Sequence, residues 1–300
     1  MENSASSQTF RLHPGEALLD VNGRKLWYEV VGEGDKIPLL LLHGGPGAPS
    51  YYLNPLRELA DERPVIFFDQ LGCGRSESIT DTSLLTISFF VDQIEALRSA
   101  LGIELFYLYG QSWGTMLGMD YYLAYPEHVK AIIFSSAALS IPLWIRECRK
   151  MLDTLPEESR EAIRINEQRG TFDDPDYQKA LDLFYQRHVV RKQPLSQDLV
   201  ATFENISSIV YSYMFGPSEF NSTGILANYD RTPQLKDIKI PVLYIVGQYD
   251  EASPTNVRYY HSLTPGSSYV EIPDAAHVTM HDAPGADVKA IRDFLKKIKE

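Results

Sequence analysis

Short runs of apolar residues, each followed by a glycine-bearing turn, recur in the first half of the chain. They occupy residues 37–45 (IPLLLLHGG), 64–74 (PVIFFDQLGCG) and 104–110 (ELFYLYG). Residues 86–103 carry apolar residues at helical spacing, which favours a helix that ends at Gly102. Strands that are apolar throughout need cover on both faces, and strands separated by helices pair in parallel. The pattern therefore predicts an α/β protein with a mostly parallel central sheet flanked by helices.

This alternation of predicted strands and helices stops after about residue 138 and resumes near residue 236. Residues 139–235 are helical in pattern, rich in charged and aromatic residues, and contain no further run typical of a buried strand. Two apolar runs, IKIPVLYIVGQYD and SSYVEIPDAAH, and a last helical segment complete the chain. We therefore predict a core made of residues 1–138 and 236–300, with residues 139–235 inserted as a helical cap subdomain.

The charge of the chain argues against several partners. Its 300 residues include 28 Lys+Arg and 40 Asp+Glu, for a formal charge of −12. Such a surface repels nucleic-acid phosphates and anionic membranes. The first residues, MENSASSQTF, lack the regions of a signal peptide, and no apolar run is long enough to span a bilayer. We expect a cytoplasmic protein without nucleic-acid or membrane partners, and its oligomeric state stays open, with a monomer compatible.

The cysteines and histidines do not indicate a metal site. Cys73 and Cys148 are too few for a disulfide framework, and we interpret both as ordinary thiols. The seven histidines show neither an HExxH pattern nor another paired metal spacing. We expect no metal and no cofactor.

The sequence GQSWG at 110–114 places Ser112 between two glycines, after a predicted strand and before a predicted helix. This is the pattern of a nucleophile elbow, in which a strained turn exposes a serine hydroxyl beyond the sheet edge. Gly110 and Gly114 remove side chains that would collide there. A chance occurrence of five residues is the alternative, and the strand and helix on either side favour the nucleophile.

A serine nucleophile needs a base, and the base needs an orienting acid. Asp250 lies just past a late apolar strand, and His277 lies in the loop after the last strand, in the order that a hydrolase with this elbow requires. The nearby competitors are Asp274, which is not at a strand end, and His281. We expect His281 to be a surface residue at the start of the final helix.

The tetrahedral intermediate of such a reaction needs hydrogen-bond donors for its oxyanion. The glycine-rich turn in LLLLHGGPG lets backbone N–H groups approach a substrate without side-chain obstruction. We assign the N–H groups of Gly45 and Trp113 to the oxyanion hole, with Gly44 as a supporting turn residue. His43, in the same turn, is expected to brace the loop by hydrogen bonding.

The segments HGGPG, FFDQLGCGRS, GQSWGT, GQYDEASP and AAHVTM, in this order, resemble the proline iminopeptidase family of serine peptidases within the α/β-hydrolase superfamily. The cap stretch IVYSYMFGPSEFNSTG is similar to that of the archaeal tricorn-interacting aminopeptidase type. The resemblance implies an α/β-hydrolase fold and a triad of Ser112, Asp250 and His277.

The resemblance also implies a substrate-binding set. In it, Glu219 and Glu251 hold the free α-amino group of the substrate, and Tyr211 lines the pocket. A partly buried carboxylate pair suits that role because a terminal ammonium needs charge-assisted hydrogen bonds. A solvated surface charge is the alternative for either glutamate.

One residue departs from the family pattern. Thr115 stands where the family usually has a second glycine after the elbow, and a β-branched residue there is able to crowd the acyl pocket or shift the helix against the strand. Among the aromatic residues of the cap, Tyr211, Tyr213, Phe215 and Phe220 either form an apolar pocket or pack the cap onto the core, and core packing is favoured for most of them.

We predict a cofactor-free serine hydrolase that releases an N-terminal residue, proline or another amino acid, from short peptides or amino-acid amides. The alternatives are an amino-acid amidase or an ester or lactone hydrolase of secondary metabolism with the same triad. A non-catalytic ligand-binding protein is a further alternative, against which the intact Ser112, Asp250 and His277 argue.

Overall fold

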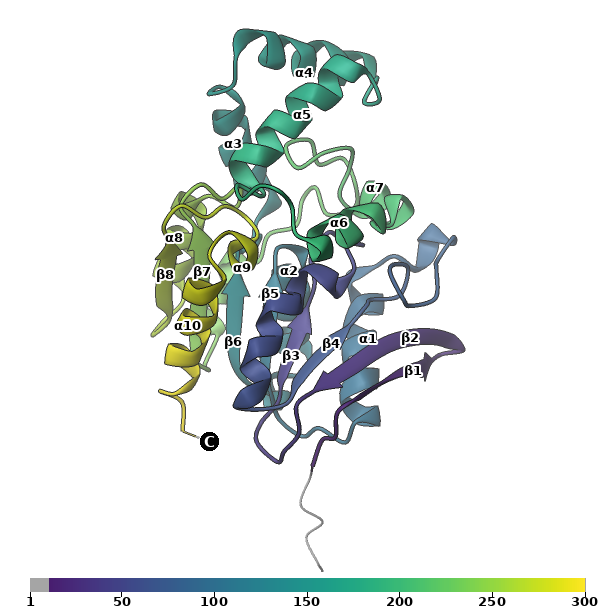
Figure 1. Ribbon diagram of the computed structural model, residues 1–300, viewed down its shortest axis with the longest axis vertical. Helices are drawn as coiled ribbons and strands as arrows, with labels where there is room; N and C mark the ends of the chain where they lie inside the picture. Colours follow the sequence, from purple (N-terminus) through teal and green to yellow (C-terminus); the bar gives the residue numbers. More distant parts are fainter. Residues whose placement is uncertain (1–10, 300) are drawn as a thin grey trace, which may run out of the picture.

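A computed structural model describes residues 11–299. Their eight strands form a single twisted sheet in the order β1-β2-β4-β3-β5-β6-β7-β8 (Figure 1). Strands β3 to β8 run parallel to one another, and β2 pairs antiparallel with both β1 and β4. The predicted mostly parallel sheet is confirmed. The strands are β1 (Gly15–Val21), β2 (Arg24–Val31), β3 (Leu39–Leu42), β4 (Val65–Phe68), β5 (Phe106–Gln111), β6 (Val129–Ser135), β7 (Val242–Gly247) and β8 (Ser268–Ile272).

The antiparallel edge of the sheet is formed by β1 and β2, and the apolar runs of the sequence do not predict β1. The two strands form a hairpin whose turn residues are Asn22 and Gly23, both with positive φ (54° and 83°). Asn-Gly is the preferred pair for such a two-residue turn, since its backbone twist matches that of the strands. Strand β1 is mostly exposed, so it lacks the apolar run by which the buried strands were found.

Buried strands alternate their side chains between the two faces of the sheet. In β3, for example, Leu39 and Leu41 belong to one apolar core, and Leu40 and Leu42 belong to the other. All four leucines are almost inaccessible to solvent. This explains why an uninterrupted apolar run, rather than an alternating one, marks each central strand.

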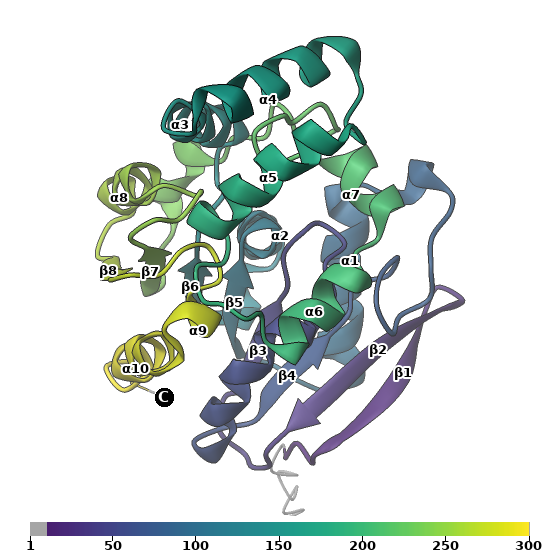
Figure 2. The same ribbon diagram turned by 45° about the horizontal axis from the view of Figure 1, so that its top comes forward.

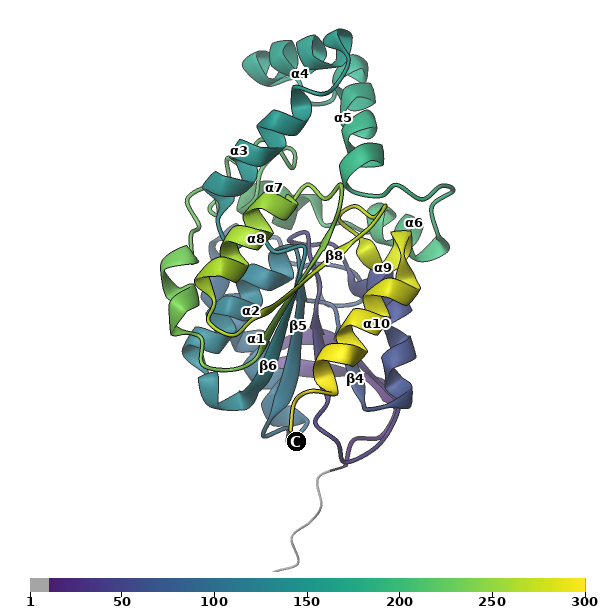
Figure 3. The ribbon, with the colours of Figure 1, turned by 90° about the vertical axis from the view of Figure 1, so that its left-hand side faces the viewer.

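Helices cover both faces of the sheet (Figure 3). On one side lie α1 (Ile87–Ala100), α2 (Trp113–Ala124) and α8 (Pro254–Leu263); on the other lie α9 (Thr279–Asp282), α10 (Pro284–Leu295) and the 3-10 segment η1 (Ser50–Asp61). The shorter 3-10 segments are η2 (Thr82–Leu84), η3 (Pro126–His128) and η4 (Thr232–Asp237).

Helix α1 ends as its sequence predicts, and its first turn is capped by a side chain. The hydroxyl of Thr86 accepts a hydrogen bond from the N–H of Phe89 (3.2 Å), which caps the first turn. At the other end Gly102 has a φ of +67°, a conformation that glycine adopts without strain.

Five helices lie between β6 and β7 in the chain: α3 (Ile141–Leu152), α4 (Glu157–Arg169), α5 (Pro175–His188), α6 (Gln197–Glu204) and α7 (Ser208–Met214). Helices α3 and α5 rise from the core on two sides, and α4 crosses above them (Figure 3). Helices α6 and α7 lie lower, between α5 and the sheet (Figures 1 and 2). None of the helices formed by residues 11–299 has both the length and the apolar character needed to cross a bilayer.

Candidate active site

Ser112 lies at the turn between β5 and α2, with backbone angles φ 54° and ψ −121°. A non-glycine residue with such a positive φ stores on the order of 1–3 kcal/mol of strain and is typical of functional sites. The flanking glycines make this turn possible. A Cβ atom on Gly110 would lie 2.3 Å from the carbonyl oxygen of Gly114, and one on Gly114 would lie 2.2 Å from that of Leu42.

Thr115 is fully buried and holds the same turn. Its hydroxyl donates to the carbonyl oxygen of Ser112 (2.6 Å) and accepts from the N–H of Ala138 (2.9 Å). It does not line the cavity around Ser112. The crowding of an acyl pocket that its β-branched side chain suggested is therefore not found, because the side chain points to the backbone that leaves β6.

His277 and Asp250 form a buried hydrogen-bonded pair, with 2.8 Å between Nδ1 and Oδ1. Asp250 follows β7 and His277 follows β8, so the two loops leave neighbouring parallel strands. Asp250 Oδ1 also accepts from the N–H of Ala252 (2.8 Å). Because its carboxylate is held by several donors, Asp250 orients the His277 ring with Nε2 directed away from it.

The two competing residues occupy other positions. Asp274 is exposed, in a turn with φ 57°. The prediction of a surface position for His281 is wrong: its side chain is buried in α9, where Nε2 donates to the carbonyl oxygen of Tyr52 (2.7 Å) and Nδ1 lies 3.1 Å from the hydroxyl of Ser196. Burial lowers its pKa. The short helix α9 turns His281 inward, which its sequence neighbours did not indicate.

Two residues that sequence reasoning missed support the His277 loop. The Ser136 hydroxyl lies 2.6 Å from Asp250 Oδ2 and 2.8 Å from the carbonyl oxygen of His277. Gln111 donates from Nε2 to that same carbonyl oxygen (3.1 Å) and accepts the hydroxyl of Tyr52 at Oε1 (2.7 Å). The position of Gln111 next to the elbow serine was an available signal, whereas Ser136 becomes visible only when β6 is placed beside β7.

The predicted oxyanion-hole residues differ in the use of their N–H groups. The N–H of Gly44 donates to the Tyr52 hydroxyl (2.7 Å), so Gly44 supports the turn. Trp113 is the first residue of α2, and its N–H therefore has no acceptor within the helix. Gly45 lines the Ser112 cavity, and its N–H meets no acceptor in the described part of the chain. The turn approaches the serine closely, because a Cβ on Gly44 would lie 3.1 Å from Ser112 Cβ.

His43 braces the loop, as predicted. Its ring is buried; Nδ1 donates to the carbonyl oxygen of Gly44 (3.0 Å), and Nε2 accepts from the N–H of Gln70 (2.9 Å). Burial lowers the pKa of this imidazole. Both cysteines are buried free thiols, and burial raises the pKa of each.

The three predicted substrate-binding residues lie together beside the serine. Tyr211 donates its hydroxyl to Glu219 Oε1 (2.7 Å), and Glu251 Oε1 lies 3.7 Å from Nε2 of His277. Glu251 is 1% exposed, and its Oε2 has no hydrogen-bond partner among the described residues. Neither glutamate forms an ion pair with Lys or Arg within residues 11–299.

Glu219 and Glu251 both have carboxyl groups with raised pKa values. Burial raises the pKa of Glu219, which is half-buried and faces the cavity. Burial, with the nearby charges of Glu219 and Asp250, raises the pKa of Glu251 well above its usual range. Two desolvated carboxyl groups without a cation form a site that a positive charge would stabilise.

Of the cap aromatic residues, Phe215 and Phe220 are buried in the apolar core, as favoured, and Tyr213 is exposed. Trp144, which was not predicted, packs edge-on against the His277 ring, with 5.5 Å between centroids. Its Nε1 donates to the carbonyl oxygen of Glu219 (2.8 Å). This indole therefore links the histidine to the glutamate.

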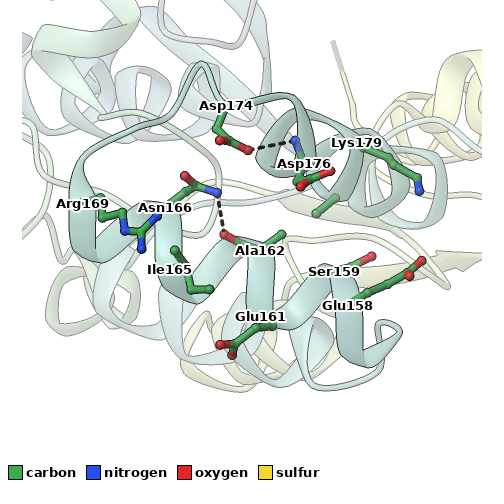
Figure 4. A pocket seen from close by; sticks show the side chains of 11 residues that line it. Glu158, Ser159, Glu161, Ala162, Ile165, Asn166, Arg169, Asp174, Asp176 and Lys179 are labelled. Carbon is green, nitrogen blue, oxygen red and sulfur yellow. Dashed lines mark hydrogen bonds between the residues drawn. The ribbon is translucent and has the colours of Figure 1, made fainter.

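Ser112, His277 and the three predicted substrate-binding residues line one small cavity of about 80 Å³, which we call the Ser112 cavity. Its lining comprises Gly45, Ala48, Tyr52, Gln111, Ser112, Val189, Leu199, Thr202, Phe203, Ile206, Tyr211, Glu219, Glu251, His277 and Val278. A larger hollow of about 480 Å³ lies between α4 and α5, lined mainly by polar and charged side chains (Figure 4). None of the predicted site residues lines that hollow.

Sequence and structure comparisons agree with this architecture. Residues 37–284 match the family model of the alpha/beta hydrolase fold, and the chain belongs to that family. A proline iminopeptidase of Heyndrickxia coagulans is 39% identical over 287 residues, covering 94% of this chain and 99% of the relative. The chain is therefore also a member of the proline iminopeptidase family.

Solved structures show the same relationship. The crystal structure of VinJ superposes with a TM-score of 0.92 at 31% identity, covering 96% of this chain and 100% of that one. The proline iminopeptidase of Mycobacterium smegmatis superposes with a TM-score of 0.86 at 33% identity, covering 94% and 98%.

Proposed function

We propose that this protein is a serine aminopeptidase that releases an N-terminal residue, with proline as the first candidate, from short peptides or amino-acid amides. The observation that carries the proposal is the convergence of Ser112, His277 and the two glutamates on one cavity. A serine with a His–Asp pair supplies acyl transfer, and the buried carboxyl groups supply recognition of a free amine.

In the proposed reaction, the Ser112 oxygen attacks the substrate carbonyl carbon while His277 Nε2 takes the hydroxyl proton. The N–H groups of Gly45 and Trp113 stabilise the oxyanion, each contributing about 3 kcal/mol to lowering the barrier. His277 then passes the proton to the leaving amine as the C–N bond breaks. A water molecule, deprotonated by His277, hydrolyses the acyl-enzyme and restores Ser112. Asp250 holds the imidazole tautomer throughout.

Glu219 and Glu251 anchor the α-ammonium group of the substrate in this scheme. The ammonium supplies the positive charge that the pair lacks, and it places the first carbonyl group of the substrate at Ser112. Substrates with a blocked amine lose this interaction and leave the carboxyl groups without a counter-charge. The anchor therefore explains why cleavage would occur after the first residue, as in an exopeptidase, rather than within a chain, as in an endopeptidase.

We also propose that residues 139–235 act as one unit, the cap, which closes the cavity above the sheet and limits the size of substrates. For the cellular location we propose the cytoplasm, on the strength of the sequence alone.

The test is a matched pair of substrates, prolyl anilide and N-acetylprolyl anilide, with the wild type, Glu219→Gln and Glu251→Gln. Each variant is expected to lose about 100-fold in kcat/KM for the free amine, because a buried charge pair of this kind contributes about 2–5 kcal/mol. The slow hydrolysis of the blocked substrate should change little. Glu158→Gln, at an exposed position of α4, is the control and should leave both rates unchanged. An equal loss for both substrates would contradict the anchor.

A further inference from the structure

A second cavity, which we call the apolar groove, lies in the cap beside the Ser112 cavity. Its volume is about 530 Å³. Its walls come from α5, from the connection between α5 and α6, and from α6 and α7, and they include the side chains of Tyr185, Val190 and Leu195. The groove is thus several times larger than the Ser112 cavity and predominantly apolar.

The two cavities adjoin each other. Val189, Phe203, Ile206, Tyr211 and Glu219 line both of them. Phe203, which belongs to this shared wall, is 41% exposed. A molecule bound at Ser112 therefore has a continuous path along these residues into the groove.

The direction of a bound substrate follows from the proposed function, on which this inference rests. The α-amino group is held at Glu219 and Glu251, and the carbonyl carbon is held at Ser112. No part of the main chain of the substrate precedes the amino group. The space beyond the Ser112 cavity is consequently available to the part of the substrate that follows the scissile bond.

The charge of the groove restricts which chemical groups are able to follow the scissile bond of the substrate. Its lining contains two carboxyl groups, those of Asp182 and Glu219, and no Lys, Arg or His from the described residues. A carboxylate on the leaving group would be desolvated in this apolar groove without a cation to compensate. A dipeptide brings such a carboxylate close to the scissile bond, and a long uncharged amine does not.

We propose that the apolar groove binds the leaving group of the substrate and that this leaving group is an uncharged apolar amine. The enzyme then hydrolyses aminoacyl amides of bulky amines more efficiently than dipeptides. The C–N bond to the amine breaks, the amine takes the proton from His277, and water supplies the hydroxyl of the released amino acid. No further reactant is needed.

The test uses prolyl amides with one acyl group and leaving amines of similar basicity: methylamine, butylamine, octylamine and, as the charged match for octylamine, 8-aminooctanoic acid. The octylamide is expected to exceed the methylamide at least about tenfold in kcat/KM, since each buried methylene strengthens binding as much as about fourfold. The 8-aminooctanoic acid amide should lose most of this gain.

Leu195→Ser tests whether the dependence on amine length comes from the groove, because Leu195 lines the groove and not the Ser112 cavity. It should reduce the ratio of octylamide to methylamide kcat/KM about threefold or more. Ile225→Ser changes an aliphatic residue of the cap that is 48% exposed and outside the groove, and should leave this ratio at the wild-type value.

Two outcomes would overturn the inference: a rate independent of amine length, or a Leu195→Ser variant that alters preference among prolyl, leucyl and phenylalanyl methylamides instead. The latter would assign the groove to the acyl side chain. Acetylated prolyl octylamide separates this failure from that of the proposed function. If the free-amine requirement persists while the length dependence is absent, only the groove assignment is wrong.

Discussion

The sheet edge and the cap both contribute to the Ser112 cavity, but they hold their residues in different ways. Ser112, Asp250 and His277 follow β5, β7 and β8, which run parallel in one sheet. The carboxyl ends of such strands meet at one edge, so the backbone itself brings the three loops together. Glu219 lies in the segment after α7, where the hydroxyl of Tyr211 holds its carboxyl group.

The difference indicates which part of the site is rigid and which is adjustable. At the sheet edge, main-chain atoms pack against one another so closely that glycine is required. The carboxyl group of Glu219 is held by a side chain instead, the hydroxyl of Tyr211, and the Trp144 indole bridges the Glu219 carbonyl oxygen and the His277 ring. We infer that the core fixes the chemistry, while the cap is the region where changes in sequence alter the choice of substrate.

The largest expected effect tests the catalytic half of the comparison. Ser112→Ala should reduce kcat by about a millionfold, as expected when a serine nucleophile is removed. The fold should persist, because the change deletes one hydroxyl group. The measurement is prolyl-anilide hydrolysis together with the melting temperature. Retention of wild-type turnover by a correctly folded variant would refute the assignment.

The next effect compares the same substitution in both regions. Gly114→Ala should destabilise the protein by about 3 kcal/mol or more, because the new Cβ meets backbone atoms that have no room to move. Gly170→Ala, in the cap, should cost only about 1 kcal/mol, because its φ is +68° but its surroundings are open.

Urea unfolding of the two glycine variants, followed by circular dichroism, measures this difference. Comparable losses at the two positions would show that close backbone contact at the elbow is not the distinguishing constraint.

Asp287 is a buried carboxyl group away from the Ser112 cavity. It therefore tests how burial affects stability without any contribution from substrate binding. Asp287 is fully buried, Thr279 donates to its Oδ1 (2.5 Å), and burial raises its pKa to about 6 from an ordinary 3.8. A raised pKa in the folded state means that the protein loses stability as the pH rises from about 4 through 6. The loss amounts to about 3 kcal/mol and is complete above that range.

Asp287→Asn removes this titration, so the free energy of unfolding of the variant relative to wild type should rise by up to about 3 kcal/mol between pH 4 and pH 7. Urea unfolding at several pH values measures the change, and comparing two pH values cancels any pH-independent cost of the substitution. Asp293→Asn, at an exposed position of the same helix, should show no such rise. A flat difference for Asp287→Asn would contradict the assigned pKa.

The smallest effect concerns a positioning residue at the sheet edge. Ser136→Ala removes the hydroxyl that lies next to both Asp250 and the His277 carbonyl oxygen. We expect a loss of about tenfold in kcat with little change in KM, because a hydrogen bond to a charged group is worth about 1.5–3 kcal/mol and part of it is replaced by the other donors to Asp250.

Ser50→Ala is the matched control for Ser136→Ala. Its hydroxyl also donates to a buried aspartate, Asp69 (2.7 Å), but it does not contact the His277–Asp250 pair. Equal effects of the two substitutions on kcat would reduce Ser136 to a purely structural role.

The sequence predicted the sheet and the residues at its edge because each leaves a local mark. An apolar run marks a buried strand, and the glycines around Ser112 mark the elbow. Strand β1 lacked such a mark because it is exposed, and the inward position of His281 depends on where α9 packs. The roles of Ser136 and Trp144 were not predicted either, because they depend on neighbours that are distant in the chain.

What the sequence determined by itself was the order of most elements and the candidate reacting groups, because strand patterning and glycine requirements are local properties of the backbone. Tertiary structure alone decided that Thr115 ties the elbow to Ala138, that two carboxyl groups share a desolvated cavity without a cation, and that an apolar groove continues from it. Desolvation and cavity shape depend on all the surrounding atoms together, and no short segment of the sequence specifies those.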